Sequence, residues 1–396
     1  MMRRLSEYFR HNFNDDVNVL TTNSYYGPGR SAFKEISQLH EEINGVQVTR
    51  FPFIGAHKKP IKFVNTVSRK ITGRHLPFYI ANTLHSGPLS PPLFRAMLNM
   101  DADVIGASSM HYKFADYPQW RKMGRHPKPF VLYGALHIEE GMQLNSRYIK
   151  RIRNAEYYIA NTLYEKQYIL RYVNDEDAIK VIGTATDIFR ETVSGDTIES
   201  YRRKIGIKQD EKIILYLGRH EDWKGIPVLI NAFTALQKRY AKCRLVIAGA
   251  STTYTKALLQ ITKENPAIIV MSDISHEEKI FILQASDIMV LPSASESFGV
   301  VFLEAWSFHK PVIGANIGAV ASVIDEGKDG LLFTPGDPVS LQQQMEILLR
   351  NEDKCRELGC NGYEKVMQQY TWEKVAAAFH HVYELAVEKF NRNRNN

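Results

Sequence analysis

The stretch from Asp287 to Pro338 constrains the fold more than any other part of the chain. It opens on the apolar run Ile288–Leu291, which is typical of a buried parallel strand, and Pro292 ends that run. A loop follows, and a helix is predicted from Ser297 to Phe308. Such strands alternate with helical segments in two successive blocks, which predicts an α/β fold with two doubly wound parallel sheets facing across a cleft.

Two glutamates in this stretch need partners. Glu304 lies among apolar residues, where burying an unpaired carboxylate would be expensive, so another group must balance its charge. Glu296 precedes it by roughly 12 Å of helical rise. Between them, backbone N–H groups near the helix start at Ser297–Gly299 favour an anion, and Gly299 permits its close approach. Two carboxylates with N–H groups between them suit a ligand that has hydroxyls at both ends and phosphate in the middle. In the alternative interpretation, Glu296 is a surface residue and Glu304 has a structural partner.

The pattern of Glu296, seven residues, Glu304, and then KPVI, GA and GLLF resembles the group 1 glycosyltransferases. These are glycogen-synthase-like retaining enzymes with the GT-B fold, and the resemblance covers nearly the whole chain. It implies that Glu304 holds the donor ribose and that Glu296 reaches hydroxyls of the donor sugar. His309 and Ala319 stand where the family favours glycine, and neither departure touches the carboxylates.

Two cations are predicted to serve the same ligand. Arg219 and Lys224 lie on the loop between the predicted strand Lys212–Tyr216 and a helix that begins near Gly225. An arginine can fork onto phosphate oxygens and a lysine supplies a point charge, so together they would neutralise a leaving diphosphate. The resemblance implies this role, and the alternative is a solvated pair of loop charges.

The resemblance also implies a set of donor-binding residues beyond Glu304. The segment Met271–Ile274 matches the place where family members hold the base through backbone groups. Asp273 stands where glycine is common, which leaves the identity of the base open. The predicted donor-binding residues are Gly218, Ile274, Ser297, Phe298, Gly299, Val300 and Glu304.

A histidine is the site candidate of the first block. His137 follows the predicted strand Pro129–Tyr133 at its carboxyl end, where ligands of doubly wound sheets collect. A lone histidine is often structural, but the resemblance places a histidine after this strand beside the transferred sugar. Glu139 is nearby. We therefore predict that His137 joins Arg219, Lys224 and Glu296 in the catalytic site.

The start of the chain admits two interpretations. Residues 16–21 and 46–53 are predicted strands that resemble the second and third strands of the family, so the usual first strand would be absent. Alternatively, residues 16–30 form the first strand and its loop, with Gly27 and Gly29 approaching the ligand. The predicted domains are 1–190 on the acceptor side, 191–371 for the nucleotide sugar, and a helix at 372–396 that crosses back to the first domain.

Charge and composition restrict the classes of binding partner and the cellular compartment that we expect. The net charge of +7 fits an anionic donor or an anionic membrane surface, whereas the scattered basic residues and the lack of a motif argue against nucleic acid. No apolar run reaches 18 residues, and three cysteines without metal-like spacing fit a reducing compartment. We expect a cytoplasmic protein with peripheral contact at the inner membrane face in the case of a lipid-linked acceptor.

The predicted function is transfer of a sugar from a nucleoside diphosphate sugar to a glycan, lipid-linked or small-molecule acceptor, with retention of configuration. No cofactor or metal is expected besides the donor substrate, because Asp101 and Asp103 precede their strand and fit a solvated strand entry. Two alternatives remain: a donor-binding but inactive partner subunit, and a GT-B-fold epimerase or phosphorylase. The sequence leaves open the nucleotide, the sugar, the acceptor and the oligomeric state.

Overall fold

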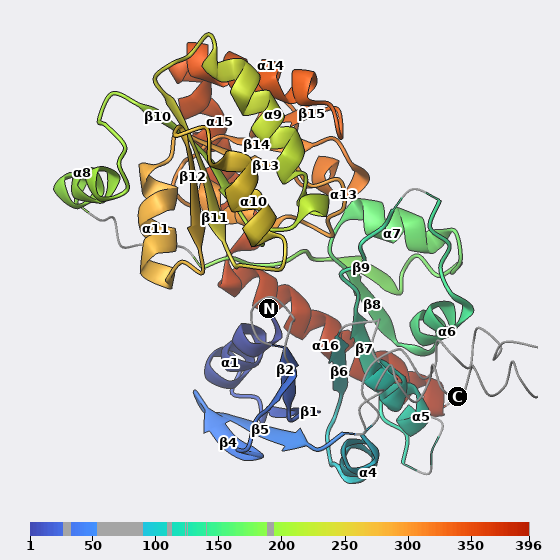
Figure 1. Ribbon diagram of the computed structural model, residues 1–396. Coiled ribbons are helices and arrows are strands. Elements are labelled where there is room, and N and C mark those ends of the chain that lie inside the picture. The colour runs from blue at the N-terminus through green and yellow to red at the C-terminus, as the bar shows by residue number, and fades with distance from the viewer. Residues whose placement is uncertain are drawn as a thin grey trace, which may run out of the picture.

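The computed structural model describes residues 1–26, 33–53, 90–108, 113–122, 124, 126–139, 141–187 and 194–395. The chain forms two α/β parts joined near residue 190 (Figure 1). We call residues 1–187 the first domain and residues 194–371 the second domain. Gly27 and Gly29, which one interpretation placed beside the ligand, lie outside the described residues.

The second domain is built on a six-stranded parallel sheet in the order β12-β11-β10-β13-β14-β15. The strand order changes direction between β10 and β13, so loops leaving their carboxyl ends diverge and leave room for a ligand. The strands are β10 (Lys212–Leu217), β11 (Cys243–Gly249), β12 (Ile268–Ser272), β13 (Ile288–Leu291), β14 (Val312–Ala315) and β15 (Gly330–Phe333). The helices of this domain are α8 (Gly195–Lys204), α9 (Ile226–Gln237), α10 (Thr255–Thr262), α11 (His276–Ala285), α12 (Val300–Trp306), α13 (Gly318–Ala321), α14 (Pro338–Arg350) and α15 (Glu352–Lys365).

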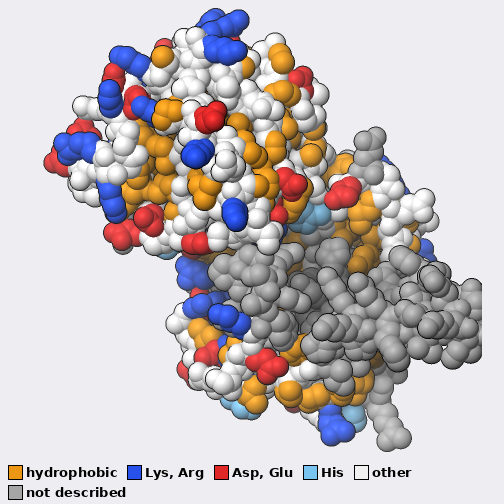
Figure 2. All heavy atoms as spheres, in the orientation of Figure 1, with side chains coloured by type: hydrophobic (Ala, Val, Ile, Leu, Met, Phe, Trp, Pro, Cys, Tyr) orange, Lys and Arg blue, Asp and Glu red, His pale blue; other side chains and the backbone are white. Residues whose placement is uncertain are grey.

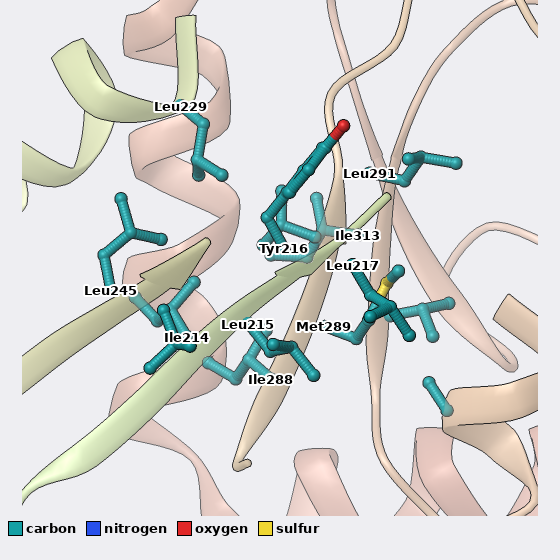
Figure 3. Close-up of a cluster of buried hydrophobic side chains, with 14 of the residues drawn as sticks. Ile214, Leu215, Tyr216, Leu217, Leu229, Leu245, Ile288, Met289, Leu291 and Ile313 are labelled. Atoms are coloured by element: carbon teal, nitrogen blue, oxygen red, sulfur yellow. The ribbon is translucent and has the colours of Figure 1, made fainter. Parts of the chain in front are cut away.

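Strand β10 is the centre of this core. Ile214 is in register with Leu245 of β11, and Leu215 is in register with Met289 of β13 (Figure 3). All four side chains are fully buried. A strand covered on both faces needs apolar residues at every position. This is why the apolar residues of β10 follow one another without polar interruptions in the sequence. The prediction of doubly wound parallel sheets is confirmed.

The first domain contains a four-stranded parallel sheet in the order β6-β7-β8-β9. A separate three-stranded sheet has the order β1-β5-β4, in which β1 and β5 are parallel and β4 and β5 antiparallel. The strands are β1 (Asn18–Thr22), β2 (Ser24–Tyr26), β3 (Phe33–Glu35), β4 (His40–Ile43), β5 (Val46–Phe51), β6 (Ile105–Ser108), β7 (Phe130–Tyr133), β8 (Tyr157–Ala160) and β9 (Ile179–Val181). The helices are α1 (Met2–Asn12), α4 (Pro91–Asn99), α5 (Tyr117–Lys122), α6 (Ser146–Asn154) and α7 (Leu163–Leu170).

The last helix, α16 (Trp372–Asn395), packs against the first domain (Figure 1). Its residues Val375, Phe379 and Val382 recur at helical spacing and enter one buried cluster with side chains of α1 and β7. The ring of Phe379 meets that of Tyr133 edge-on, with 5.4 Å between centroids. This helix therefore contributes to the core beneath the carboxyl end of β7.

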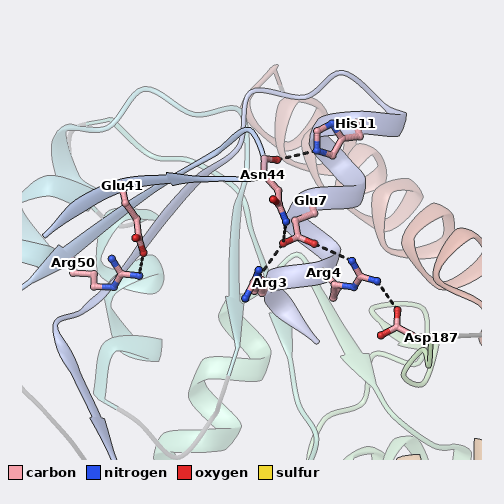
Figure 4. A network of polar contacts seen from close by, with 8 residues as sticks. All are labelled: Arg3, Arg4, Glu7, His11, Glu41, Asn44, Arg50 and Asp187. Carbon is pink, nitrogen blue, oxygen red and sulfur yellow. Dashed lines mark hydrogen bonds and ion pairs between the residues drawn. The ribbon is translucent and has the colours of Figure 1, made fainter. Parts of the chain in front are cut away.

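A polar network fastens α1 to its surroundings (Figure 4). The carboxylate of Glu7 accepts hydrogen bonds from Arg3 at 3.0 Å, from Asn44 at 2.9 Å and from Arg4 at 3.3 Å. Arg4 also reaches Asp187 at 2.6 Å. Burial acts to raise the pKa of Glu7, but these hydrogen bonds outweigh it and lower the pKa. The network thus ties α1 to the turn before β5 and to the end of the first domain.

Acidic and basic side chains are interspersed over the described part of the face in Figure 2, without one dominant patch of either sign. Among the described residues, no helix is both long enough and apolar enough to cross a membrane.

Candidate functional site

The predicted site residues gather where three strands end. Gly218 and Arg219 follow β10, Glu296 lies on the loop after β13, and His137 lies on the loop after β7. The first two loops leave the point where the strand order of the second sheet changes direction. Open parallel sheets bind ligands at this position.

Lys224 and Glu296 form an ion pair across this point. Their Nζ and Oε1 atoms are 2.5 Å apart, and the side chains are 13% and 10% exposed. Gly225, which follows the lysine, has φ of +78°, and a Cβ atom there would lie 2.2 Å from the carbonyl oxygen of Pro292. Only glycine therefore allows the lysine loop to approach the β13 loop this closely.

Arg219 and Lys224 both contact the ring of Trp223. The Arg219 guanidinium is 5.7 Å and the Lys224 ammonium 4.4 Å from the ring centroid of Trp223. The indole is 44% exposed, and the Arg219 carbonyl accepts a hydrogen bond from Tyr216 at 2.8 Å. The structure thus brings the two predicted cations together around a tryptophan that sequence reasoning missed, because a single aromatic on a loop has no periodic signal.

Glu304 is balanced by Lys279 of α11. The Nζ of Lys279 is 2.8 Å from Oε1 of Glu304, and the two side chains are 25% and 15% exposed. The expectation that Glu304 needs a partner is met by a protein group. Lys279 was not predicted, because its contact spans 25 residues and lacks a local motif.

The predicted helix start at Ser297 is wrong. Helix α12 begins at Val300 and has seven residues. Gly299 has φ of +87°, a left-handed conformation that an α-helix does not contain, and a Cβ there would lie 2.5 Å from the ring of Phe302. Ser297 and Phe298 therefore belong to the loop. Phe298 is 3% exposed and meets Tyr370 edge-on, so its side chain belongs to the core.

The first domain contributes His137 and Glu139. Oγ of Ser295, on the second-domain loop, donates to Oε1 of Glu139 at 3.4 Å. Desolvation lowers the pKa of His137, the carboxylate of Glu296 acts against this, and the ammonium of Lys224 adds to it. The charges of Lys224 and Glu296 thus act on the pKa of His137 in opposite directions.

Asp273 and Ile274 follow β12, and Ile274 is half-buried against the core. Asp273 has φ of +54°, which explains why glycine suits this position. Its carboxylate accepts hydrogen bonds from the backbone N–H of Ser251 at 2.8 Å and from its hydroxyl at 2.6 Å. The bonds from Ser251 lower the pKa of Asp273. Asp273 thus stays ionised and fixes the neighbouring loop after β11.

Comparisons with known proteins show what the chain is similar to. Residues 197–365 match the family model described as "Glycosyl transferases group 1". An uncharacterized glycosyltransferase of Methanocaldococcus jannaschii is 25% identical over 293 residues, 73% of this chain and 74% of that protein. The D-inositol 3-phosphate glycosyltransferase of Corynebacterium urealyticum is 31% identical over 236 residues, and the matched part spans 57% of this chain and 55% of that enzyme.

Solved structures share the fold. Sucrose-phosphate synthase from Thermosynechococcus elongatus has a TM-score of 0.71 at 18% identity, with 97% of this chain and 92% of that one covered. Anabaena HepE in complex with UDP-glucose has a TM-score of 0.66 at 17% identity, covering 92% and 98%. These structural likenesses show that the chain has the GT-B fold. Within the second domain, residues 197–365 are similar to the group 1 glycosyltransferases.

Proposed function

We propose that this protein transfers a sugar from a nucleoside diphosphate sugar to an acceptor with retention of anomeric configuration. The observation that carries the proposal is the Lys224–Glu296 pair at the switch point, with Arg219 beside it and with both charges of the pair acting on the pKa of His137. Two cations and one carboxylate at one strand edge suit a ligand that joins a diphosphate to a polyhydroxylated ring.

Each group has a distinct part in the proposed reaction. As the bond between sugar and phosphate breaks, negative charge grows on the diphosphate and positive charge on the sugar ring. Arg219 and Lys224 stabilise the diphosphate, while Glu296 accepts hydrogen bonds from sugar hydroxyls. Because Lys224 contacts Glu296, the proposed sites for the diphosphate and the sugar adjoin each other. The carboxylate of Glu304 accepts a hydrogen bond from a hydroxyl of the donor ribose.

His137 acts in its neutral form. Its lowered pKa keeps the imidazole uncharged at neutral pH, so one ring nitrogen can donate to the sugar while the other accepts. In this proposal the leaving phosphate takes the acceptor proton, and no separate base is assigned. Closure of the two domains would exclude water from the reacting centre.

The donor nucleotide is proposed to be UDP, since the HepE structure contains UDP-glucose. The acceptor class is a glycan, a lipid-linked sugar or a small polyol. The formal net charge of +7 supports an anionic acceptor or peripheral contact with an anionic membrane, and three free cysteines support a cytoplasmic setting.

Calorimetric titration with UDP, GDP and ADP tests the donor site. We expect UDP, and neither GDP nor ADP, to bind wild type, and we expect Glu304→Ala to lose about tenfold or more in UDP affinity, since a hydrogen bond to a charged group contributes about 1.5–3 kcal/mol. Glu346→Ala is the matched control, because Glu346 is similarly buried and ion-paired with Arg350 on α14. The proposal fails if the folded wild type binds none of the three.

Turnover is then measured with sugars of the nucleotide that binds, with the anomeric configuration of the product read by proton NMR. We expect transfer or slow donor hydrolysis with retention. Binding without any turnover would instead indicate a donor-binding partner subunit, and a changed sugar that remains attached to the nucleotide would indicate an epimerase.

A further inference from the structure

A carboxylate in the first domain is buried without a cationic partner among the described residues. Glu165 of α7 is 1% exposed. It accepts hydrogen bonds from the hydroxyl of Tyr158 at 2.6 Å, from the backbone N–H of Asn161 at 2.7 Å and from the backbone N–H of Leu136 at 3.1 Å. Burying a carboxylate without hydrogen-bond donors is costly. The donors that satisfy Glu165 are therefore held in place around it, and two of them are backbone N–H groups.

The backbone that Glu165 holds is the loop after β7. A Cβ atom at Gly134 would lie 1.7 Å from the Tyr158 hydroxyl and 2.3 Å from Oε1 of Glu165. Ala135 has φ of +61°, a left-handed conformation that costs a non-glycine residue about 1 kcal/mol or more. The loop therefore leaves the strand in a strained turn wrapped closely around the carboxylate.

His137 is the residue immediately after this turn. Leu136, whose N–H donates to the carboxylate, is 1% exposed, whereas His137 is exposed, and the charges of Lys224 and Glu296 act on its pKa. We propose that Glu165 is the positioning residue for His137: its carboxylate fixes the 134–136 turn and so aims the imidazole at the donor sugar. The role of His137 in this inference rests on the proposed function. The hydrogen bonds between Glu165 and the 134–136 turn do not depend on that function.

The charge state of Glu165 matters to this role. An ionised carboxylate accepts all three hydrogen bonds, while a carboxamide presents two N–H groups of its own to the same donors. Burial raises the pKa of Glu165 to about 7, and its hydrogen bonds act against that rise. The titratable groups that face it are the phenols of Tyr158 and Tyr133, whose pKa values burial also raises. The charges that act on the pKa of His137 are those of Glu139, Glu296 and Lys224.

The test compares Glu165→Gln with the matched control Glu156→Gln. Glu156 is also buried, at 4% exposed, but it accepts the N–H of Phe130 at 2.7 Å, at the opposite end of β7. In Glu165→Gln we expect sugar transfer to fall about 10- to 100-fold, as for misplacement of a reacting group by about 1 Å. Nucleotide affinity, which depends on the second domain, should remain unchanged in both variants.

Two readouts separate positioning from a general loss of structure. The NMR titration of His137 should shift in Glu165→Gln and not in Glu156→Gln. In a double-mutant cycle, Glu165→Gln should cost little further activity in the His137→Ala background, because its effect passes through the histidine. Tyr158→Phe removes one hydrogen bond to Glu165, so it should shift the His137 titration in the same direction by a smaller amount. This variant replaces Glu165→Gln in the test if Glu165→Gln does not fold.

Unchanged transfer and an unchanged His137 titration in folded Glu165→Gln would overturn the inference, as would fully additive losses in the cycle. Failure of the proposed function is a different result: wild type would then bind no nucleotide and transfer no sugar. The NMR titration would still decide whether Glu165 sets the environment of His137.

Discussion

Replacement of Gly225 by alanine should destabilise the second domain and loosen the Lys224–Glu296 pair together. Two effects contribute. The left-handed backbone at φ of +78° costs an alanine about 1–2 kcal/mol. The new Cβ would lie 2.2 Å from the Pro292 carbonyl oxygen, and relieving such overpacking costs about 1–3 kcal/mol more. We therefore expect a loss of about 2–5 kcal/mol.

Gly206→Ala separates the two effects. Gly206 has the same φ of +78°, but a Cβ atom there would have open space around it, with nothing within 4 Å, so this variant should lose only the conformational part. The gain from a stiffer unfolded chain is common to both variants and cancels in their difference. Urea unfolding should thus show Gly225→Ala to be less stable than Gly206→Ala by about 1–3 kcal/mol.

The same pair of variants links stability to ligand binding. Displacement of the loop moves Lys224 away from Glu296, so nucleotide affinity should fall about tenfold in Gly225→Ala and stay unchanged in Gly206→Ala. Equal destabilisation of the two variants, with equal nucleotide affinity, would refute the argument that close approach to Pro292 holds the site together.

Three further outcomes are expected. Lys279→Met leaves the carboxylate of Glu304 unpaired and should lower the free energy of unfolding by about 1–3 kcal/mol, which urea unfolding measures; a loss no larger than that of an exposed lysine would count against the pair. Trp223→Leu removes the ring shared by two cations and should weaken nucleotide binding a few-fold by calorimetry, since each cation–π contact contributes about 0.5–1 kcal/mol; an unchanged affinity would exclude that role. Burial raises the pKa of Glu165 from 4.5 to about 7, so the folded state binds its proton more tightly than the unfolded state. Stability should therefore fall by about 3 kcal/mol as pH rises from 4.5 through 7 and then level off, and this part of the pH dependence should vanish in Glu165→Gln.

Local patterns predicted much of the second domain. The run Lys212–Tyr216 became β10, which extends to Leu217, and Ile288–Leu291 became β13 with the predicted bounds. A capping box of Ser275 and Glu278 opens α11, and it is a local pattern too, because both of its hydrogen bonds are made within one turn. Prediction failed at Ser297, where the left-handed Gly299 delays the helix to Val300. A glycine can adopt either conformation, and its neighbours in space choose between them.

The sequence alone determined the α/β class and the identity of the candidate carboxylates and cations, since strand burial and motif spacing are properties of neighbouring residues. Tertiary structure decided which groups meet. Lys224 contacts Glu296 across 72 residues, and Glu165 holds Leu136 across 29. Lys279 was unremarked in the sequence until the fold placed it beside Glu304. Such pairs form only after separate strands align in one sheet, because their contact depends on the packing of elements that carry no local record of each other.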